Sequence, residues 1–154
     1  MKKVLVAIEL SDDVAHFVIG KALDVCGPQA QLEVVHVVDP ASVTYSVDPT
    51  MTGQMYQQMF EQVMSTSKRR LAEICAPFAI STDRQHVRYG RVAHEVHALL
   101  TEGEFDACMV GSHGYAGWRR LLGSKANAIL HGTPVDTWVF SLAQMQVEST
   151  SEDG

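Results

Sequence analysis

The sequence predicts an α/β fold in which a mostly parallel, five-stranded sheet carries helices on both faces. Short, continuously apolar segments recur along the chain, as expected of strands that are covered on both sides. Segments with apolar residues at helical spacing separate them. Because strands and helices alternate strictly, right-handed crossovers should make the strands parallel and place the ligand site at their carboxyl ends.

The first unit is a strand followed by a helix. The strand is the apolar run at residues 4–8, VLVAI. Ser11 is a candidate N-cap, and Asp12 and Asp13 lie in the first helical turn, where the helix dipole favours negative charge. Apolar residues then recur at helical spacing until Gly27 and Pro28, which end the helix.

The second unit contains the longest predicted helix. Residues 32–38, LEVVHVV, form a second buried strand, and residues 41–52 are expected to be a polar loop. A helix then spans about 54–76 and ends at Pro77. We expect its methionines to fill the core, although a flexible binding surface is the alternative. Its apolar series consists of Met51, Met55, Met59, Val63, Met64, Leu71 and Ile74.

The remaining elements follow the same alternation. A short strand is predicted at 86–89, and Gly90 turns the chain into a helix that ends at Gly103. The last three elements are a strand at 105–110, a helix at 119–130 and a strand at 135–142. These elements assign residues 1–143 to one domain and residues 144–154 to a flexible acidic tail.

Composition excludes several classes of protein. The chain of 154 residues carries 12 Lys and Arg against 18 Asp and Glu, a net charge of −6, which argues against nucleic acid as a partner. Its three cysteines, Cys26, Cys75 and Cys108, lie far apart among apolar residues, as reduced core thiols do. The first apolar run is too short for a signal sequence or a membrane span, so we expect a cytoplasmic protein.

The segment 111–130 carries the densest chemical signal. Its glycines Gly111, Gly114 and Gly117 follow the fourth predicted strand and permit close approach of the backbone to an anion. The spacing fits neither a Walker A loop nor the dinucleotide fingerprint, which belongs after the first strand. We therefore interpret the segment as a phosphate-binding loop, with a strand-to-helix turn that binds no ligand as the alternative.

These residues resemble the universal stress protein family over about residues 2–142, nearest to its universal stress protein A branch. Glu9-Leu10-Ser11 after the first strand is similar to the family's VAxDxS pattern, and residues 35–37, VHV, to its second-strand LHV. GSHG at 111–114, followed by Gly123-Ser124, resembles its nucleotide motif. The resemblance implies a Rossmann-like sheet of the adenine nucleotide alpha hydrolase type, a homodimer formed through the last strand, and a stress-response protein.

The resemblance also implies a site for ATP or another adenine nucleotide at residues 111–125. Strand one would flank base and ribose, the second and fourth strands would enclose the adenine, and the loop would hold ribose and phosphates. The implied site residues are Ala7, Glu9, Val37, Val110, Gly111, His113, Gly114, Gly123, Ser124 and Lys125. Arg119 and Arg120 add positive charge beside this loop, although a solvated helical turn explains them equally well.

Two departures from the family pattern keep a second interpretation open. Eight residues separate Gly114 from Gly123, one fewer than in the ATP-binding pattern, and Glu9 stands where those members have Asp. The alternative function is a dimeric interaction module of the universal stress protein A type that binds no nucleotide. A flavin or electron-transfer protein would share the architecture but lacks a phosphate loop after strand one.

The remaining candidate groups predict no catalytic or metal site. His94 and His97 are spaced for two ligands but have no third, and His36, between valines, is expected to be a hydrogen-bonded core histidine. No residue is placed to activate water, so any ATPase activity should be weak. The last strand alternates aromatic and polar residues, with Trp138 and Phe140 on one face, and we expect a symmetric dimer through residues 135–142.

Overall fold

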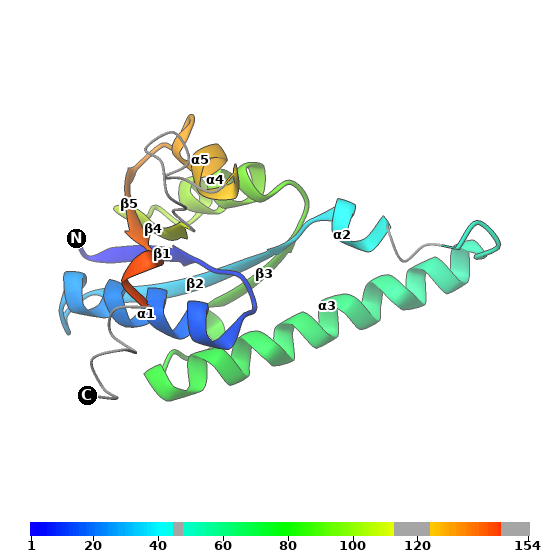
Figure 1. The fold of residues 1–154 in the computed structure, drawn as a ribbon, viewed down its shortest axis with the longest axis horizontal. Helices are drawn as coiled ribbons and strands as arrows, with labels where there is room; N and C mark the ends of the chain where they lie inside the picture. Colours follow the sequence, from blue (N-terminus) through cyan, green and yellow to red (C-terminus); the bar gives the residue numbers. More distant parts are fainter. Residues whose placement is uncertain (45–47, 113–123, 146–154) are drawn as a thin grey trace.

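The computed structural model describes residues 1–44, 48–112 and 124–145 and confirms the predicted α/β fold. Five parallel strands form one sheet in the order β3-β2-β1-β4-β5 (Figure 1). The strands are β1 (Lys3–Ala7), β2 (Gln31–Val38), β3 (Gln85–Tyr89), β4 (Ala107–Ser112) and β5 (Asp136–Ser141). The helices are α1 (Asp12–Cys26), α2 (Pro40–Thr44), α3 (Gly53–Cys75), α4 (Val92–Glu102) and α5 (Ser124–Leu130), with short 3₁₀ turns at Ala76–Phe78 and Thr82–Arg84.

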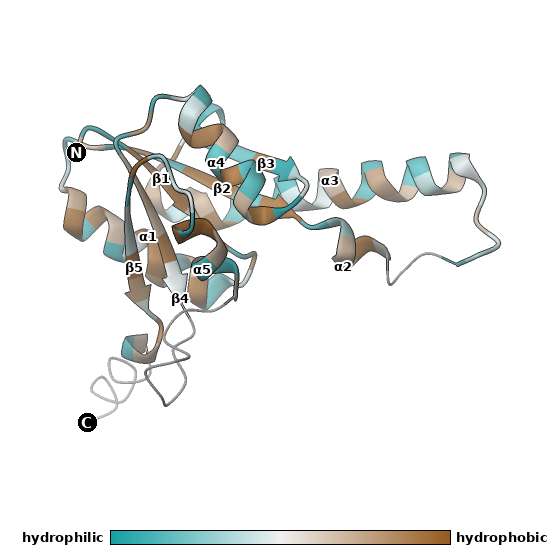
Figure 2. Ribbon diagram, turned by 90° about the horizontal axis from the view of Figure 1, so that it is seen from above, coloured by the Kyte–Doolittle hydropathy of each residue, from teal (hydrophilic) through white to brown (hydrophobic). Residues whose placement is uncertain are grey.

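Helices cover both faces of the sheet, and each face has its own core. Helices α1 and α3 pack on one face, and α4 and α5 on the other (Figure 1). The central strands β1 and β2 are largely apolar, as Figure 2 shows. Alternate residues of β1 therefore enter different cores: Val4 and Val6 face α1, whereas Leu5 faces α4. This two-sided burial explains why the strand sequences are continuous apolar runs.

The strand register brings residues of three strands together at one edge of the sheet. Ala7, the last residue of β1, lies opposite Val35 of β2 on one side and Val110 of β4 on the other. All three side chains belong to the core beneath α4 and α5. Because the strands are parallel, their carboxyl ends meet here, at the edge where ligands of this architecture bind.

Helix α1 follows the predicted boundaries. Ser11 occupies the N-cap position with extended backbone angles, but its side chain makes no capping hydrogen bond. Gly27 follows the helix with φ of 75°, a conformation that glycine adopts without steric cost, and its amide donates to the Leu23 carbonyl oxygen. The positions of Ser11 and Gly27 in the sequence therefore predicted both ends of this helix correctly.

The prediction of a loop at residues 41–52 was wrong at its start. Helix α2 begins at Pro40, and Val43 in this helix is 5% exposed. Proline is favoured in the first helical turn, where no hydrogen bond is lost, so Pro40 starts a helix here rather than simply ending the strand. Strand β4 also begins at Ala107, two residues later than expected, because the chain turns at Glu104 with φ of 53°. Phe105 is buried, at 5% exposure, before the strand begins.

The methionine prediction for the long helix was wrong for its first turns. Helix α3 is about 34 Å long at 1.5 Å per residue, and its first half extends beyond the sheet as an arm (Figure 1). Only the second half reaches the core, through Leu71 and Ile74. Met55 is 48% exposed, so it fills no core. The helical spacing of apolar residues predicted the apolar face of α3 correctly. It could not show that the sheet ends before the first turns of the helix and leaves them uncovered.

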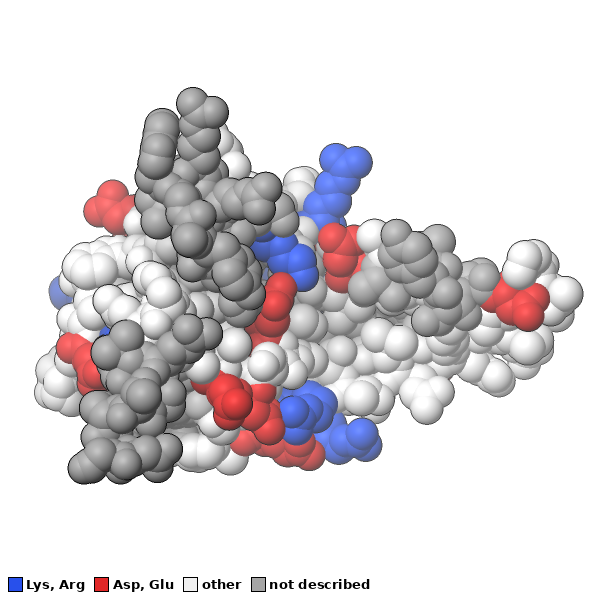
Figure 3. Space-filling view, viewed as in Figure 1, with Lys and Arg blue, Asp and Glu red and all other residues white. Residues whose placement is uncertain are grey.

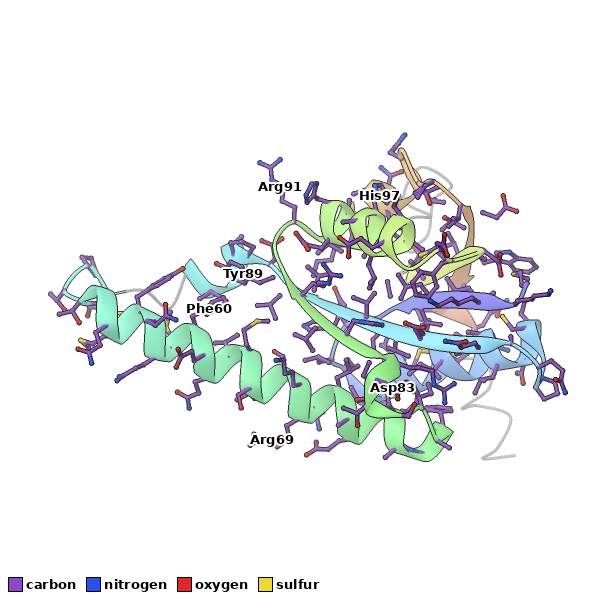
Figure 4. The ribbon with its side chains drawn as sticks, turned by 180° about the vertical axis from the view of Figure 1, so that it is seen from behind. Phe60, Arg69, Asp83, Tyr89, Arg91 and His97 are labelled. Carbon is purple, nitrogen blue, oxygen red and sulfur yellow. The ribbon has the colours of Figure 1, made fainter. Side chains whose placement is uncertain are left out.

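An aromatic contact supports the arm where it leaves the sheet. The rings of Phe60 on α3 and Tyr89 at the end of β3 meet edge to face, with centroids 4.8 Å apart, and lie side by side in Figure 4. Thr52 caps the arm, accepting a hydrogen bond from the Met55 amide at 3.2 Å. The arm is thus anchored at its base and capped at its tip.

A buried ionic cluster joins three neighbouring strands at the opposite end of the sheet. Glu33 of β2 is 7% exposed; its Oε2 lies 2.6 Å from His86 Nε2 on β3, and its Oε1 lies 3.4 Å from Lys3 Nζ on β1. Burial alone would raise the pKa of Glu33. The hydrogen bond from His86 and the charge of Lys3 outweigh burial and hold that pKa below its ordinary value.

The lowered pKa of Glu33 predicts a loss of stability in acid. A carboxylate whose pKa is lower in the folded protein adds stability above its unfolded pKa and loses it as the pH falls through the folded value. We therefore expect the free energy of unfolding to drop more steeply below about pH 4.5 in wild type than in Glu33→Gln. Urea denaturation at successive pH values measures this, with Glu61→Gln on the exposed arm as the control. Parallel pH profiles for wild type and Glu33→Gln would contradict it.

The chain after the last strand continues to pack for a few residues. Leu142 is 7% exposed, and Met145 packs partly against the core beneath α1, so the start of the predicted tail contacts the domain. Residues 146–154, the rest of that tail, lie outside the described residues. Within the ranges that the structure describes, no helix combines the length and the apolarity needed to cross a membrane.

Candidate functional site

A cavity of about 220 Å³ opens at the carboxyl edge of the sheet. Its walls come from the ends of β1, β2 and β4 and from helices on both faces. Most of the wall is apolar, and the polar groups that line it are Glu9, His36 and Lys125. Small-molecule sites commonly have this composition, an apolar pocket with a few polar groups that fix orientation.

Six of the ten predicted site residues line this one cavity: Ala7, Glu9, Val37, Val110, Gly111 and Lys125. They come from four segments that are distant in the sequence. Val37 is 8% exposed and Val110 is 2% exposed, so these two apolar side chains line the buried part of the cavity. The strands of a parallel sheet bring such residues together because their carboxyl ends share one edge.

Three predicted residues, His113, Gly114 and Gly123, lie outside the described residues, as do Arg119 and Arg120. Ser124 is the first residue of α5, directly before Lys125. On the phosphate side of the predicted site, the structure therefore describes only Gly111, near the end of β4, and the start of α5. The phosphate-binding role of the glycines between them stays a prediction.

Gly111 has a role in packing that can be described directly. A Cβ atom at this position would lie 2.7 Å from Val18 Cγ2 and 3.2 Å from Leu142 Cδ2, and the first distance is shorter than van der Waals contact allows. Val18 and Leu142 also line the cavity. Glycine here lets α1 and the end of β5 approach β4 and so sets the width of the cavity.

An ion pair spans the polar side of the cavity. Lys125 Nζ donates to Glu9 Oε1 at 2.8 Å, and the two side chains are 56% and 54% exposed. The pair connects the segment after β1 to the first turn of α5. Exposed pairs of this kind contribute little to stability, and this pair places one negative and one positive charge at the mouth of the cavity.

His36 is hydrogen-bonded, as predicted, and it also lines the cavity, which was not predicted. Its Nδ1 lies 3.0 Å from the Ile8 carbonyl oxygen, which can only accept, so Nδ1 carries the proton. Burial lowers the pKa of His36, the Ile8 contact opposes this, and the charge of Lys125 acts in the same direction as burial. The neutral imidazole therefore leaves Nε2 as an acceptor.

Sequence reasoning missed most of the apolar wall of the cavity. The additional apolar lining residues are Ile8, Val35 and Leu142, which lie in or directly after strands, and Val14, Val18, Val92, Val96, Ala126 and Ile129, which lie on helices. The sequence identifies several of the helical residues only as members of apolar helix faces. The available signal was topological: the first turns of helices that follow parallel strands lie at the carboxyl edge, so Val14 and Val92 belong near any ligand bound there.

The other candidate groups have structural roles. Nε2 of His97 lies 2.6 Å from the Ile129 carbonyl oxygen, which ties α4 to α5. Among the described residues, no group of three His, Cys, Asp or Glu side chains is arranged to hold a metal ion. Burial raises the pKa of Cys75 to about 11 and that of Cys108 to about 12, so both thiols stay protonated at neutral pH, as a packing role requires.

Figure 3 shows charged groups of both signs on one face of the described residues. Acidic and basic groups are mixed over the part of this face that covers the sheet, and most of the described surface of the arm is uncharged.

Comparisons with known proteins agree with this geometry. The family model described as "Universal stress protein family" matches residues 1–141. Universal stress protein A homolog 1 of Coxiella burnetii is 35% identical over 136 residues, which cover 88% of this chain and 92% of that protein.

Two solved structures share the fold at low sequence identity. The hypothetical protein MJ0577 has a TM-score of 0.71 and 16% identity, with 91% of this chain and 95% of that chain covered. A universal stress protein in complex with cAMP has a TM-score of 0.55 and 19% identity, with 91% and 96% covered.

Proposed function

The chain belongs to the universal stress protein family, and from this premise we propose that it binds an adenine nucleotide in the cavity at the carboxyl edge of the sheet. Members of the family bind adenine nucleotides, and one structural neighbour is described in complex with cAMP. The observation that carries the proposal is the convergence of Ala7, Val37, Val110 and Lys125 on one cavity.

The cavity is too small to enclose a whole nucleotide, so part of the ligand would lie inside it and part at its mouth. At about 220 Å³ the cavity is smaller than the roughly 300–1,000 Å³ typical of ligand pockets. We therefore place the adenine in the apolar interior beside Val37 and Val110, the ribose near Glu9 and the phosphates near Ser124 and Lys125. His113, Gly114 and Gly123 complete the proposed phosphate side.

We propose a stress-response protein that acts by binding rather than by turnover. His36, the titratable group in the cavity with the strongest burial, donates from Nδ1 to the Ile8 carbonyl oxygen, and the nearby carboxylate Glu9 is paired with Lys125. Glu9 is therefore held by Lys125, and His36, whose Nε2 remains an acceptor, lies at the strand ends where we place the base rather than the phosphates, so we expect at most weak ATPase activity. A reducing cytoplasm is the compartment that suits the three free cysteines.

The alternative function is a non-nucleotide interaction module of the universal stress protein A type. It is favoured by the short spacing between Gly114 and Gly123 and by the similarity to a universal stress protein A homologue. Isothermal titration calorimetry of the full chain with ATP, ADP, AMP and cAMP separates the two functions. Saturable binding of any of them supports the nucleotide proposal, with GTP as the control for base specificity. No binding at millimolar concentration of all four overturns it.

We also propose a symmetric homodimer through residues 135–142. Strand β5 lies at one edge of the sheet, and Trp138 on this strand is 43% exposed. An unpaired edge with exposed aromatic surface is suited to pairing with a second copy. Light scattering at micromolar concentration should give the mass of two chains, and Trp138→Lys should reduce it to that of one. A wild-type protein with the mass of a single chain would overturn this proposal.

A further inference from the structure

The cation proposed to meet a phosphate is already paired with a carboxylate of the same cavity. Lys125 Nζ lies 2.8 Å from Glu9 Oε1, and both side chains line the cavity. A phosphate near Lys125 would therefore stand close to the negative charge of Glu9. Uncharged ligands, in contrast, leave the pair intact.

The pairing implies an exchange of partners when a charged ligand binds. Hydrogen bonds from an ammonium group to a carboxylate and to a phosphate are both charge-assisted, and an ion pair as exposed as this one is weak enough to be exchanged. Lys125 can therefore leave Glu9 for a phosphate. The cost of the exchange is the lost pair together with the repulsion between Glu9 and the phosphate.

We propose that Glu9 and Lys125 set the preference of this cavity for ligand charge: Lys125 favours phosphorylated adenine ligands over adenosine, and Glu9 limits that preference by competing for Lys125. This rests on the proposed function, because it requires an adenine ligand in the cavity. This role of Glu9 adds to its proposed contact with the ribose and has the opposite effect. The ribose contact strengthens the binding of every ligand, whereas competition for Lys125 weakens only the charged ones, so the ratio of AMP affinity to adenosine affinity isolates the competition.

The pKa of His36 reports the charges of Lys125 and Glu9 without any ligand. The charge of Lys125 lowers the pKa of His36 and that of Glu9 raises it, in addition to the larger effect of burial. Removing Lys125 should therefore shift the His36 titration to higher pH, and neutralising Glu9 should shift it to lower pH. Histidine NMR titrations of the wild type, Lys125→Met and Glu9→Gln would measure both shifts.

The decisive experiment compares adenosine with AMP in the full chain by calorimetry. Glu9→Gln should raise the ratio of AMP affinity to adenosine affinity two- to fivefold, the range expected for releasing an exposed ion pair. Lys125→Met should lower that ratio about tenfold, as loss of a charge-assisted hydrogen bond does. In the double variant the gain from Glu9→Gln should be smaller, because only the repulsion between Glu9 and the phosphate is left to remove. Glu61→Gln, which removes an exposed carboxylate on the arm, is the matched control.

The outcomes separate this proposal from the proposed function. If Glu9→Gln weakens adenosine and AMP equally, or changes neither, competition for Lys125 is wrong while nucleotide binding stands. The same conclusion follows if Glu9→Gln raises the ratio of AMP affinity to adenosine affinity as much without Lys125 as with it. If wild type binds neither adenosine nor AMP, nor the other nucleotides tested, the proposed function itself fails and this proposal fails with it.

Discussion

The Ala7→Leu variant is expected to bind adenine nucleotides at least tenfold more weakly than wild type while keeping its fold. Ala7 lies in register between Val35 and Val110, and it lines the cavity from the end of β1. Leucine at this position would extend into a space of about 220 Å³ and occupy part of the volume proposed for the base. A tenfold loss corresponds to about 1.4 kcal/mol, a modest cost for displacing a buried ring.

Calorimetry with AMP measures this loss, and circular dichroism verifies that the variant is folded. Ala72→Leu is the matched control, because Ala72 is exposed on α3 and the same substitution there leaves the cavity untouched. Unchanged AMP affinity in a folded Ala7→Leu protein would show that the ligand does not occupy this part of the cavity.

The Gly111→Ala variant is expected to lower the free energy of unfolding by about 1–3 kcal/mol, the usual cost of overfilling a packed core. The new Cβ would lie 2.7 Å from Val18 Cγ2, so α1 or β4 must shift. Among the described residues the glycines with positive φ are Gly27, Gly90 and Gly132, so for Gly111 the cost comes from packing rather than from backbone strain. Because Val18 lines the cavity, nucleotide affinity should fall as well.

Gly20→Ala is the matched control for Gly111→Ala and should have the opposite effect. Gly20 lies within α1, and a Cβ there meets nothing within 4 Å. Alanine should therefore stabilise the helix by about 0.5–1 kcal/mol. Urea denaturation of both variants measures the two effects. Equal stability of Gly111→Ala and wild type would show that the close approach of Val18 does not require glycine.

The sequence predicted the three inner strands well because β1, β2 and β4 are buried on both faces. Such strands are continuous apolar runs that can be recognised without knowledge of distant residues. The edge strand β3, which is half-buried and not an apolar run, was placed within one residue by the regular alternation of strands and helices. The site residues on the strands followed from the same logic. Once the strands are parallel, Ala7, Val37 and Val110 must end at one edge, and the family resemblance selected these positions.

The exposure of the first turns of α3 and the presence of α2 could not be predicted from local sequence. The stripe that includes Met55 continues the buried face of α3, but whether a stripe is covered depends on where the sheet ends. Helix α2 was missed because proline after a strand signals both a strand end and a helix start, and local sequence does not distinguish them.

The pairing of Glu9 with Lys125 could not be predicted for a related reason. Both residues had been assigned to the site, Glu9 to the ribose and Lys125 to the phosphates, from positions 116 residues apart. Their 2.8 Å contact is a tertiary fact that depends on how α5 is placed against the end of β1. That contact joins two separately predicted site residues into one ion pair, and the proposed charge preference follows from it.

The cavity at the carboxyl edge of the sheet is the proposed site for the base of an adenine nucleotide. An NMR titration with AMP of the protein labelled at methyl and amide groups tests this site, because the resonances locate the ligand as well as detect it. We expect saturable shifts centred on Ala7, Val37, Val110 and His36. Saturation with shifts confined to a distant surface such as the arm of α3, or no shifts at millimolar AMP, would contradict it.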